Sequence, residues 1–503
     1  MDGVVRKFEK AVVVSFFAFI GAILISNLSS SYSWLGYNLE KQNKYILILT
    51  PIILLCVIIL SLYQTKKKSD ILKVSVIVAI TLIQILFVEA LSTQTGWDSG
   101  AVINAALQTD IQASSQYLSV YPNNLILVFM YKFVFSLFRV DINHAYFVAS
   151  IMNVFIVDLS VYMMTKICLH CFGQECNRVF CFFSFLFLLF SPWLIIPYSD
   201  VVAMMFVVST VFWYLKLGRF ENVLLRCILF GLLGGWIAIG IKIKPTTVVA
   251  IVTIFIHARI KGIKKKETND FKFFCVLLLG MTIILWLINS LLERQDVFEL
   301  DATRKMTMTH YMMMSLNDNL GVYTDEDYWI SQSASNVDER QQVNMKEIKK
   351  RLKDKGLAGY FEGQWKRSRQ IFGEGNFNWG GEAGAYFINY DFNQHPILRN
   401  LFYTRGCNYG FYFYGSQAAW FTVLALLILN SFRIIKYGIR DEELLFILPI
   451  IGVWLFQLIF ESRSRYLIAF LPFILAESSA ISVEIKRVGK IIECKRQSLC
   501  KKY

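Results

Sequence analysis

The chain has 503 residues, of which 55% are hydrophobic and 17% charged, and its formal net charge is +14. This balance excludes an ordinary soluble globular protein, which would carry more charge. The basic excess does not indicate a nucleic-acid partner, because it gathers beside apolar runs, as in KKK (66–68), KGIKKK (261–266) and the C-terminal KRQSLCKKY.

Apolar runs long enough to cross a bilayer recur along the chain, which predicts an all-α polytopic membrane protein with about 12–13 transmembrane helices. The first run resembles a signal peptide, but it lacks a convincing cleavage site and we expect it to be the first span. We expect spans near 11–28, 45–63, 71–92, 143–166, 179–197, 200–217, 224–241, 245–258, 272–292, 414–433, 442–460 and 466–482.

The basic loops predict the direction of these spans, because Lys and Arg are enriched in cytoplasmic loops. The protein is expected in a cell membrane, with a bacterial plasma membrane favoured, and the low proline with high Lys, Ile and Asn content is compatible with an AT-rich bacterial genome. The segments expected on the outer face are 93–121, 198–199, 242–244, 293–413 and 461–465.

One apolar run, NLILVFMYKFVFSLF (124–138), does not fit this scheme, because a single crossing there would invert every later loop. We favour a juxtamembrane or re-entrant segment, and a miscounted span elsewhere is the alternative. The predicted domains are an N-terminal transmembrane module (1–292) that contains the external loop 93–121, an extracytoplasmic domain of mixed or irregular structure (293–413), and C-terminal helices with a basic cytoplasmic tail (414–503). Within the second, NVDERQQVNMKEIKKRLKDKG (336–356) predicts a surface helix that stops at the glycine.

Ten cysteines raise the possibility of a metal site, and Cys168, Cys171, Cys176 and Cys181 with His170 have a loosely zinc-like spacing. The spacing is irregular, and Cys181 already lies in the next apolar run. Ordinary cysteines at a membrane boundary are the preferred interpretation, so no metal ligands are assigned.

Two aspartates fall where the chain emerges on the expected outer face. Asp98 in TQTGWDSG follows the third span, and a helix cap is its ordinary explanation. Asp200 ends SPWLIIPYSD (191–200), where Pro192 and Pro197 break the helix and expose backbone. An N-cap of the next span is the alternative role for Asp200.

Basic residues reach the same face from two distant hairpins. Lys242 and Lys244 in IKIKPTT (241–247) could be snorkelling lysines, yet the positive-inside bias disfavours them there unless an anionic lipid headgroup offsets the placement. Arg463 and Arg465 in ESRSRY could simply pair with Glu461, or one could bind phosphate while Glu461 holds the other. On a helix, residues two apart do not face one ligand, so we expect one arginine, Arg465, at the phosphate.

These motifs resemble those of GT-C-type membrane glycosyltransferases, related to the protein O-mannosyltransferases and bacterial aminoarabinose transferases. The matching stretches are GWDSG with Asp98, YPNN (121–124) in place of a Tyr-Pro-Pro-like motif, SPWLIIPYSD, IKIKPT and ESRSRYLIAFLP. MTHYMMMSLNDNLGVYTDED also resembles a stretch found in a branch of bacterial integral-membrane transferases.

The resemblance implies a glycosyltransferase that moves a sugar from a polyprenyl-phosphate donor to a glycan, lipid or protein acceptor outside the membrane. Asp98 becomes the expected general base and Asp200 a group that orients the acceptor or a metal, although the sequence requires no divalent cation or other cofactor. The expected ligands of the donor phosphate are Lys242, Lys244, Arg463 and Arg465. The expected supporting residues are Glu461, Tyr121, Asn123, His310 and Tyr311, with Asn317 as a further candidate for the cavity wall.

Two other functions stay open at this point. A polysaccharide polymerase or ligase that uses a lipid-diphosphate glycan would also combine many spans, a large external loop and outward arginines. A transporter of lipid-linked sugars is less favoured, because neither an inverted repeat nor broken helices near mid-membrane are evident in the sequence.

Overall fold

The computed structural model describes residues 2–29, 43–63, 70–265 and 269–500. The predicted basic segment KKK (66–68), the last lysine of KGIKKK and the last three residues of the tail lie outside the described residues. The α-helices are α1 (Asp2–Ser29), α2 (Asn43–Leu62), α3 (Asp70–Leu91), α4 (Trp97–Leu107), α5 (Ile111–Val120), α6 (Leu125–Phe138), α7 (Ile142–Cys171), α8 (Gln174–Ser184), α9 (Ser199–Leu217), α10 (Val223–Ile243), α11 (Val248–Lys265), α12 (Asn269–Glu293), α13 (Met308–Met314), α14 (Asp325–Gln332), α15 (Val337–Ile371), α16 (Pro396–Phe402), α17 (Tyr409–Tyr437), α18 (Leu444–Ile459), α19 (Leu471–Ser479) and α20 (Ser482–Cys500).

The predicted all-α polytopic fold is confirmed. Among the described residues, 11 helical segments are long and apolar enough to cross a membrane, or up to 12 if one bent pair counts as a single span. The upper figure agrees with the expected count of about 12–13, although the run at 179–197 is not among these segments, because it is not one helix. There α8 and a π-helical turn (Phe185–Leu189) end before Ser191, and Pro192 begins a short 3-10 turn.

The run at 124–138 forms α6, which continues from α5 across a sharp bend. The two helices meet at 111° at Tyr121 and Pro122, so they do not form one straight span. Pro122 opens the 3-10 turn between them, where its missing N–H costs no helical hydrogen bond. This geometry is compatible both with a broken span and with the re-entrant segment that we favoured.

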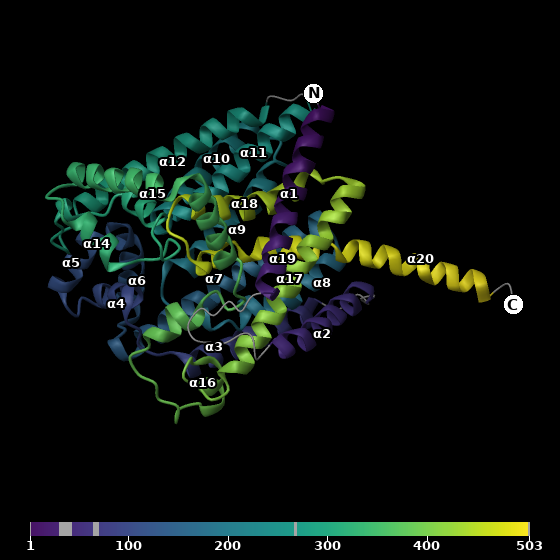
Figure 1. Ribbon diagram of the computed structural model, residues 1–503, viewed down its shortest axis with the longest axis horizontal. Helices are drawn as coiled ribbons and strands as arrows, with labels where there is room; N and C mark the ends of the chain where they lie inside the picture. Colours follow the sequence, from purple (N-terminus) through teal and green to yellow (C-terminus); the bar gives the residue numbers. More distant parts are fainter. Residues whose placement is uncertain (1, 30–42, 64–69, 266–268, 501–503) are drawn as a thin grey trace.

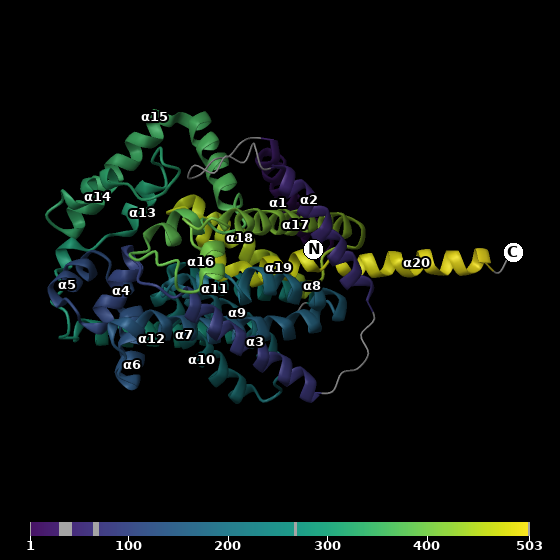
Figure 2. The ribbon, with the colours of Figure 1, turned by 90° about the horizontal axis from the view of Figure 1, so that it is seen from below.

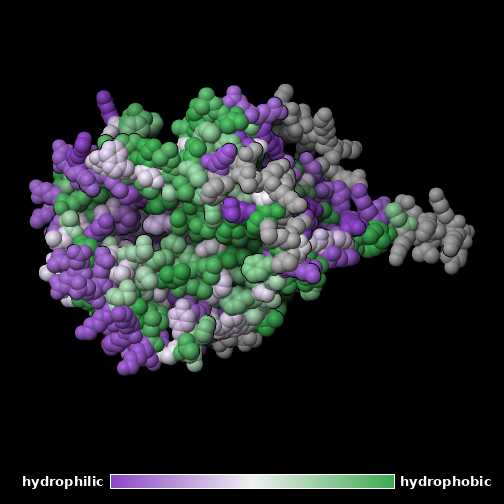
Figure 3. Space-filling model, turned by 90° about the horizontal axis from the view of Figure 1, so that it is seen from above, coloured by the Kyte–Doolittle hydropathy of each residue, from purple (hydrophilic) through white to green (hydrophobic). Residues whose placement is uncertain are grey.

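The spans form a bundle in which α19 lies near the centre and α12 on the outside. Of the residues in the most apolar part of the span that contains α19, 89% are buried inside the protein. The corresponding fraction for α12 is 6%. Figures 1 and 2 show α4, α5, α6 and the segment from α13 to α15 gathered at one end of the bundle, with α20 extending from the other. Figure 3 shows polar side chains at the former end and apolar ones over the flank.

Glycines allow α10 and α12 to pack closely. A Cβ on Gly234 would collide with the carbonyl oxygen of Leu277, and a Cβ on Gly280 would collide with the carbonyl oxygen of Gly231. Small residues at such an interface let two helix backbones approach, which is how spans associate without a hydrophobic driving force.

The segment between α12 and α17 contains helices and irregular loops, and no strand among its described residues. The helix predicted at 336–356 is confirmed, with Asn336 as its N-cap. Gly356 has non-helical backbone angles (φ +59°, ψ −175°) and interrupts α15 where the glycine stop was expected, and a second helical stretch continues to Ile371. Glycine adopts this positive φ without the steric cost that other residues have.

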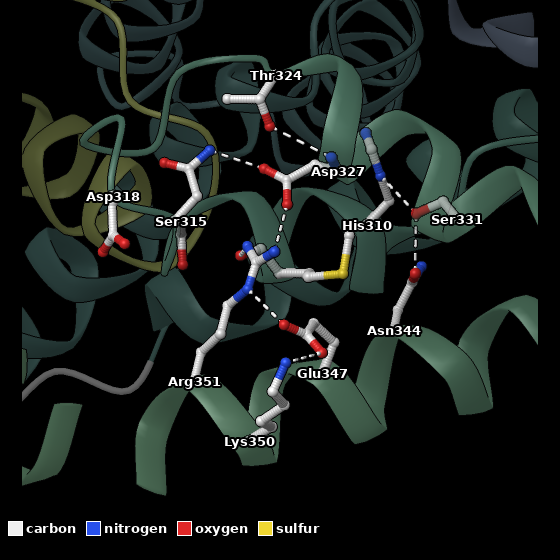
Figure 4. Close-up of polar contacts among 12 residues, drawn as sticks. His310, Ser315, Asp318, Thr324, Asp327, Ser331, Asn344, Glu347, Lys350 and Arg351 are labelled. Atoms are coloured by element: carbon white, nitrogen blue, oxygen red, sulfur yellow. Dashed lines mark hydrogen bonds and ion pairs between the residues drawn. The ribbon is translucent and has the colours of Figure 1, made fainter. Parts of the chain in front are cut away.

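A buried ion pair holds the first half of α15 against α14. Arg351 lies 2.7 Å from Asp327 and 3.1 Å from Glu347 (Figure 4). Asn317 donates to the second oxygen of Asp327 at 2.7 Å and accepts from the amide of Gly321 at 2.9 Å. Asn317, a candidate for the cavity wall, therefore stabilises this loop.

Candidate functional site

Asp98 sits on the first turn of α4, in a loop that two backbone hydrogen bonds attach to a distant segment. The amide of Gly96 donates to the carbonyl of Tyr386 at 2.8 Å, and the amide of Ile388 donates to the carbonyl of Gln94 at 2.9 Å. Gly100 permits the tight turn into α4, because a Cβ there would collide with the carbonyl oxygen of Thr95. The loop is thus anchored just before Asp98.

The carboxylate of Asp98 accepts two hydrogen bonds from tyrosines. Tyr117 of α5 donates to Oδ1 at 3.0 Å, and Tyr198, just before α9, donates to Oδ2 at 3.1 Å. The amide of Asn124 donates in turn to the Tyr117 hydroxyl at 2.6 Å. The carboxylate of Asp98 is thus half-buried and held by hydrogen bonds, unlike that of an exposed loop aspartate.

Burial is the largest influence on Asp98. It raises the pKa of the carboxyl above its usual value, and the charge of Arg465 and the bonds from Tyr117 and Tyr198 oppose that rise. A carboxylate with a raised pKa is a stronger base than a solvated one, provided that it remains ionised.

Asp200 and Lys244 form a buried ion pair at 2.6 Å. Asp200 lies on the first turn of α9, directly after the proline-broken segment, and Lys244 is the residue that follows α10. The Nε of Arg465 is 3.7 Å from the other oxygen of Asp200, and the Lys244 ammonium lies 4.0 Å from the centre of the Tyr466 ring. The structure therefore brings Asp200 and Lys244, which the sequence analysis proposed for the site, together with Arg465.

Arg463 and Arg465 point to the same carboxylate, which contradicts the expectation that they diverge. Arg463 has extended backbone (φ −144°, ψ 132°) and precedes the 3-10 turn Ser464–Phe470, which contains Arg465, so the two side chains do not follow the spacing of an α-helix. Glu382 is 3.3 Å from Nη1 of Arg463 and 2.9 Å from Nε of Arg465.

Glu461 holds Arg463, as predicted, at 2.8 Å, and it accepts a hydrogen bond from the Tyr466 hydroxyl at 2.5 Å. Burial opposes the ionisation of Glu461. The charges of Arg463 and Arg465 and the bond from Tyr466 outweigh burial and hold the pKa of Glu461 below its usual value. Arg465 also lies 4.5 Å from the centre of the Trp97 ring, which joins the arginines to the Asp98 loop.

Glu382 is the functional candidate that the sequence analysis missed. It lies in a π-helical turn (Trp379–Ala383), and Asn378 donates to its Oε1 at 3.0 Å. Burial and the charge of Glu382 raise the pKa of the nearby Glu374 to about 7. The turn is rich in Gly, Asn and Trp without helical or strand periodicity, so no sequence pattern indicated it.

These side chains are called the charged cluster below. Its members are Asp98, Asp200, Lys244, Glu382, Glu461, Arg463 and Arg465.

Lys242 is not brought into the charged cluster. It donates to Asn289 of α12 instead, away from Asp200 and Arg465. Lys242 is on the last turn of α10 and Lys244 beyond its end, so the two neighbours leave the helix in different directions.

The remaining candidates surround the charged cluster unevenly. Tyr121 packs against Tyr117 with ring centres 5.4 Å apart. Asn123 is exposed and donates to the side chain of Asn124 at 3.3 Å. Tyr311 packs against His310 with ring centres 5.2 Å apart, and burial, followed by the charges of Glu461 and Asp98, raises its pKa.

His310 has a structural environment. It is buried and lies 2.7 Å from the Ser331 hydroxyl, which donates in turn to Asn344 (Figure 4). Burial lowers the pKa of His310 to about 4, so it is neutral at neutral pH. Among the described residues, no group of three or more His, Cys, Asp and Glu side chains is arranged to hold a metal ion.

The fold and the charged cluster define a polytopic α-helical integral membrane protein with ionisable residues concentrated at one end of its bundle. The chain belongs to the family described as conserved hypothetical integral membrane protein, whose profile matches residues 4–484. No curated protein sequence matches the chain significantly.

Two solved structures are similar in part. The first is ArnT from Cupriavidus metallidurans bound to undecaprenyl phosphate, which is 10% identical in sequence. The alignment covers 82% of this chain and 78% of the ArnT chain, with a TM-score of 0.34. ArnT from the same organism in the apo state shares 11% identity, with coverage of 82% and 77% and a TM-score of 0.31.

Proposed function

We propose that this protein is a glycosyltransferase that takes a sugar from a polyprenyl-phosphate donor and transfers it to an extracytoplasmic glycan, lipid or protein. The observation that carries the proposal is the charged cluster itself. A hydrogen-bonded carboxylate, Asp98, lies in one connected set with Lys244, Arg463 and Arg465, which come from segments far apart in the sequence.

Asp98 acts as the general base in this proposal. A base needs a geometry that holds it beside the acceptor and a pKa near the working range. The two tyrosine hydrogen bonds fix the orientation of the carboxylate, and burial raises its pKa. A new glycosidic C–O bond forms as the acceptor hydroxyl gives its proton to Asp98, and the anomeric C–O bond to phosphate breaks with its electron pair leaving on the phosphate.

Lys244 and Arg465 stabilise the charge on the leaving phosphate, and Arg463 supports Arg465. Preorganised cations at a leaving group are among the largest electrostatic contributions to such a step. Lys242 is not included, because it is directed to Asn289. Asp200 orients Lys244, which replaces the acceptor-orienting role that the sequence suggested.

The donor must compete with carboxylates for these cations. The cluster has four carboxylates, Asp98, Asp200, Glu382 and Glu461, and three cations, so it carries a net charge of −1 when all are ionised. A phosphate can therefore bind only if an arginine exchanges a carboxylate for it. Glu382, which contacts both arginines, is the partner that we expect to yield.

The proposal places the charged cluster on the outer face of a bacterial plasma membrane. Residues 293–413 then form an extracytoplasmic domain whose Tyr311 approaches the cluster, with Tyr121 and Asn123 on the side of α5. Five loops expected on one face contribute to the cluster or to its neighbours, which supports this orientation.

The test uses the purified full-length chain and a single polyprenyl-phosphate sugar in detergent or nanodiscs. We expect release of polyprenyl phosphate that depends on an added acceptor, and loss of this release in Asp98→Asn. Release of polyprenyl diphosphate from a lipid-diphosphate glycan would instead indicate a polymerase or ligase. Normal release by Asp98→Asn would remove Asp98 as the base.

A further inference from the structure

A second site lies at the opposite end of the same helices. A cavity of about 150 Å³ lies between the C-terminal parts of α9 and α11 and the first turns of α10. Glu442, which precedes α18, also lines it. Asp200 and Tyr214 stand at the two ends of α9, so the cavity is separated from the charged cluster by about 20 Å of helix.

Most of the ionisable groups that line the cavity are basic. We call this cavity the basic cavity. Its basic and acidic lining residues are His170, Arg219, Arg226, His257, Lys261 and Glu442. Asp441, beside Glu442, also interacts electrostatically with His257. Counting both carboxylates, the three permanent cations still exceed the two acids, so the basic cavity favours an anion.

Ring contacts orient the basic side chains. The guanidinium of Arg219 lies 2.7 Å from Nε2 of His170, and that of Arg226 stacks 3.9 Å from the centre of the Phe273 ring. His257 is 4% exposed, and its Nδ1 lies 2.9 Å from the Tyr214 hydroxyl. Arg219 and His170 are exposed, so the basic cavity has an open basic rim above a buried polar floor.

The walls between the basic groups are apolar. Leu215, Phe230, Ile254 and Phe274 line the basic cavity beside the cations. A volume of about 150 Å³ exceeds that of one or two waters and accommodates a group the size of phosphate with a few attached carbons. The basic loops around it are those that the charge pattern predicts on the cytoplasmic face.

We propose that the basic cavity binds a phosphate group, carried by an anionic membrane lipid headgroup or present as a free anion. Arg219 and Arg226 supply charge-assisted hydrogen bonds, Lys261 supplies a further positive charge, and the apolar walls accept the carbons next to the phosphate. This site is independent of the proposed transfer reaction.

The experiment measures thermal unfolding of the full-length protein in a neutral detergent. Three probes are titrated separately: short-chain phosphatidylglycerol, short-chain phosphatidylcholine and inorganic phosphate. A saturable rise of the unfolding temperature with phosphatidylglycerol alone identifies a lipid headgroup, and a rise with inorganic phosphate as well identifies a general phosphate site. No saturable rise with either anion overturns the proposal.

Variants of residues that line the basic cavity test whether the anion binds there. Arg219→Gln and Lys261→Gln should each weaken the apparent affinity for the anion about tenfold, as expected for the loss of one charge-assisted contact. Lys216→Gln removes an exposed positive charge from the same end of α9 without lining the basic cavity, and it should leave the affinity unchanged. Equal weakening by all three variants would show general charge attraction and overturn the assignment.

Discussion

The carboxylate of Glu382 and the guanidinium of Arg465 are 2.9 Å apart, and the same carboxylate also reaches Arg463. A residue of the long segment between α12 and α17 thus occupies both arginines that we expect to bind the donor phosphate. The arginines are preorganised by Glu382, and the same contact competes with an incoming anion.

Replacing Glu382 with glutamine should strengthen the binding of a polyprenyl-phosphate donor. The change removes one negative charge next to Arg463 and Arg465, so the net charge of the cluster rises from −1 to zero. We expect an affinity about tenfold higher, measured by microscale thermophoresis of the detergent-solubilised protein. Glu362→Gln, at an exposed carboxylate paired with Lys366, serves as the control. Unchanged or weaker donor binding by Glu382→Gln would show that Glu382 does not compete with phosphate.

Asp98→Asn should lower transfer at least 100-fold while donor binding and the unfolding temperature stay close to those of the wild type. The amide keeps the shape of the carboxylate and cannot accept a proton as a base. Transfer is measured by release of polyprenyl phosphate. Asp110→Asn is the matched control, because Asp110 caps α5 from an exposed position and asparagine caps equally well. Equal losses in both variants would point to the fold of the loop rather than to base catalysis.

The rate of transfer should fall on acidification, as Asp98 becomes protonated. Burial raises the pKa of Asp98, and the hydrogen bond from Tyr198 lowers it, so removing that bond leaves a still higher pKa. Tyr198→Phe should therefore move the acidic limb of the kcat/KM profile to higher pH. Tyr146→Phe provides the control, since Tyr146 donates to the carbonyl of Thr95 and not to Asp98. A limb that moves to lower pH in Tyr198→Phe would exclude Asp98 as its origin.

Breaking the buried pair of Asp200 and Lys244 should destabilise the protein strongly. A single Lys244→Met change leaves Asp200 with one fewer cation in a buried site, and the expected loss in the free energy of unfolding is about 3–5 kcal/mol. The double variant Asp200→Leu with Lys244→Met should recover most of this loss, because no charge is left unpaired at that position. Chemical denaturation in mixed micelles measures both. A double variant less stable than the single one would show that the pair is stabilising in itself.

The interface of α10 and α12 should not tolerate a methyl group. Gly280→Ala places a Cβ against the backbone of Gly231, so the helices must separate, and the unfolding temperature should fall by several degrees. Gly415→Ala, in the second turn of α17 with open space around it, should be neutral or slightly stabilising. Similar effects of both changes would indicate that helix propensity, not the close approach, determines the result.

The members of the charged cluster were largely predictable because topology places alternate loops on one face. Counting spans from the basic loops was sufficient to group Asp98, Asp200, Lys244 and the ESRSRY segment. The error in one span, at 179–197, did not disturb this grouping, because the residues after Pro192 still return to the same end.

The details that sequence could not supply depend on local backbone geometry. Lys242 and Lys244 seemed equivalent, but the helix ends between them and only Lys244 faces Asp200. The two arginines were expected to diverge as on an α-helix, but the chain passes from extended backbone at Arg463 into a 3-10 turn, and both side chains reach one carboxylate. Glu382 comes from an aperiodic turn, and only the folded chain shows what it contacts.

The attachment of the Asp98 loop to the segment near Phe387 has a consequence for biosynthesis. Thr93 donates to the carbonyl of Asn389, 296 residues later, beside the two backbone bonds that hold Gly96 and Ile388. The ribosome must therefore synthesise and the membrane must receive more than three quarters of the chain before the loop can take its final position. Contacts of such long sequence separation form late, so the site is assembled near the end of insertion and a prematurely terminated chain would remain inactive.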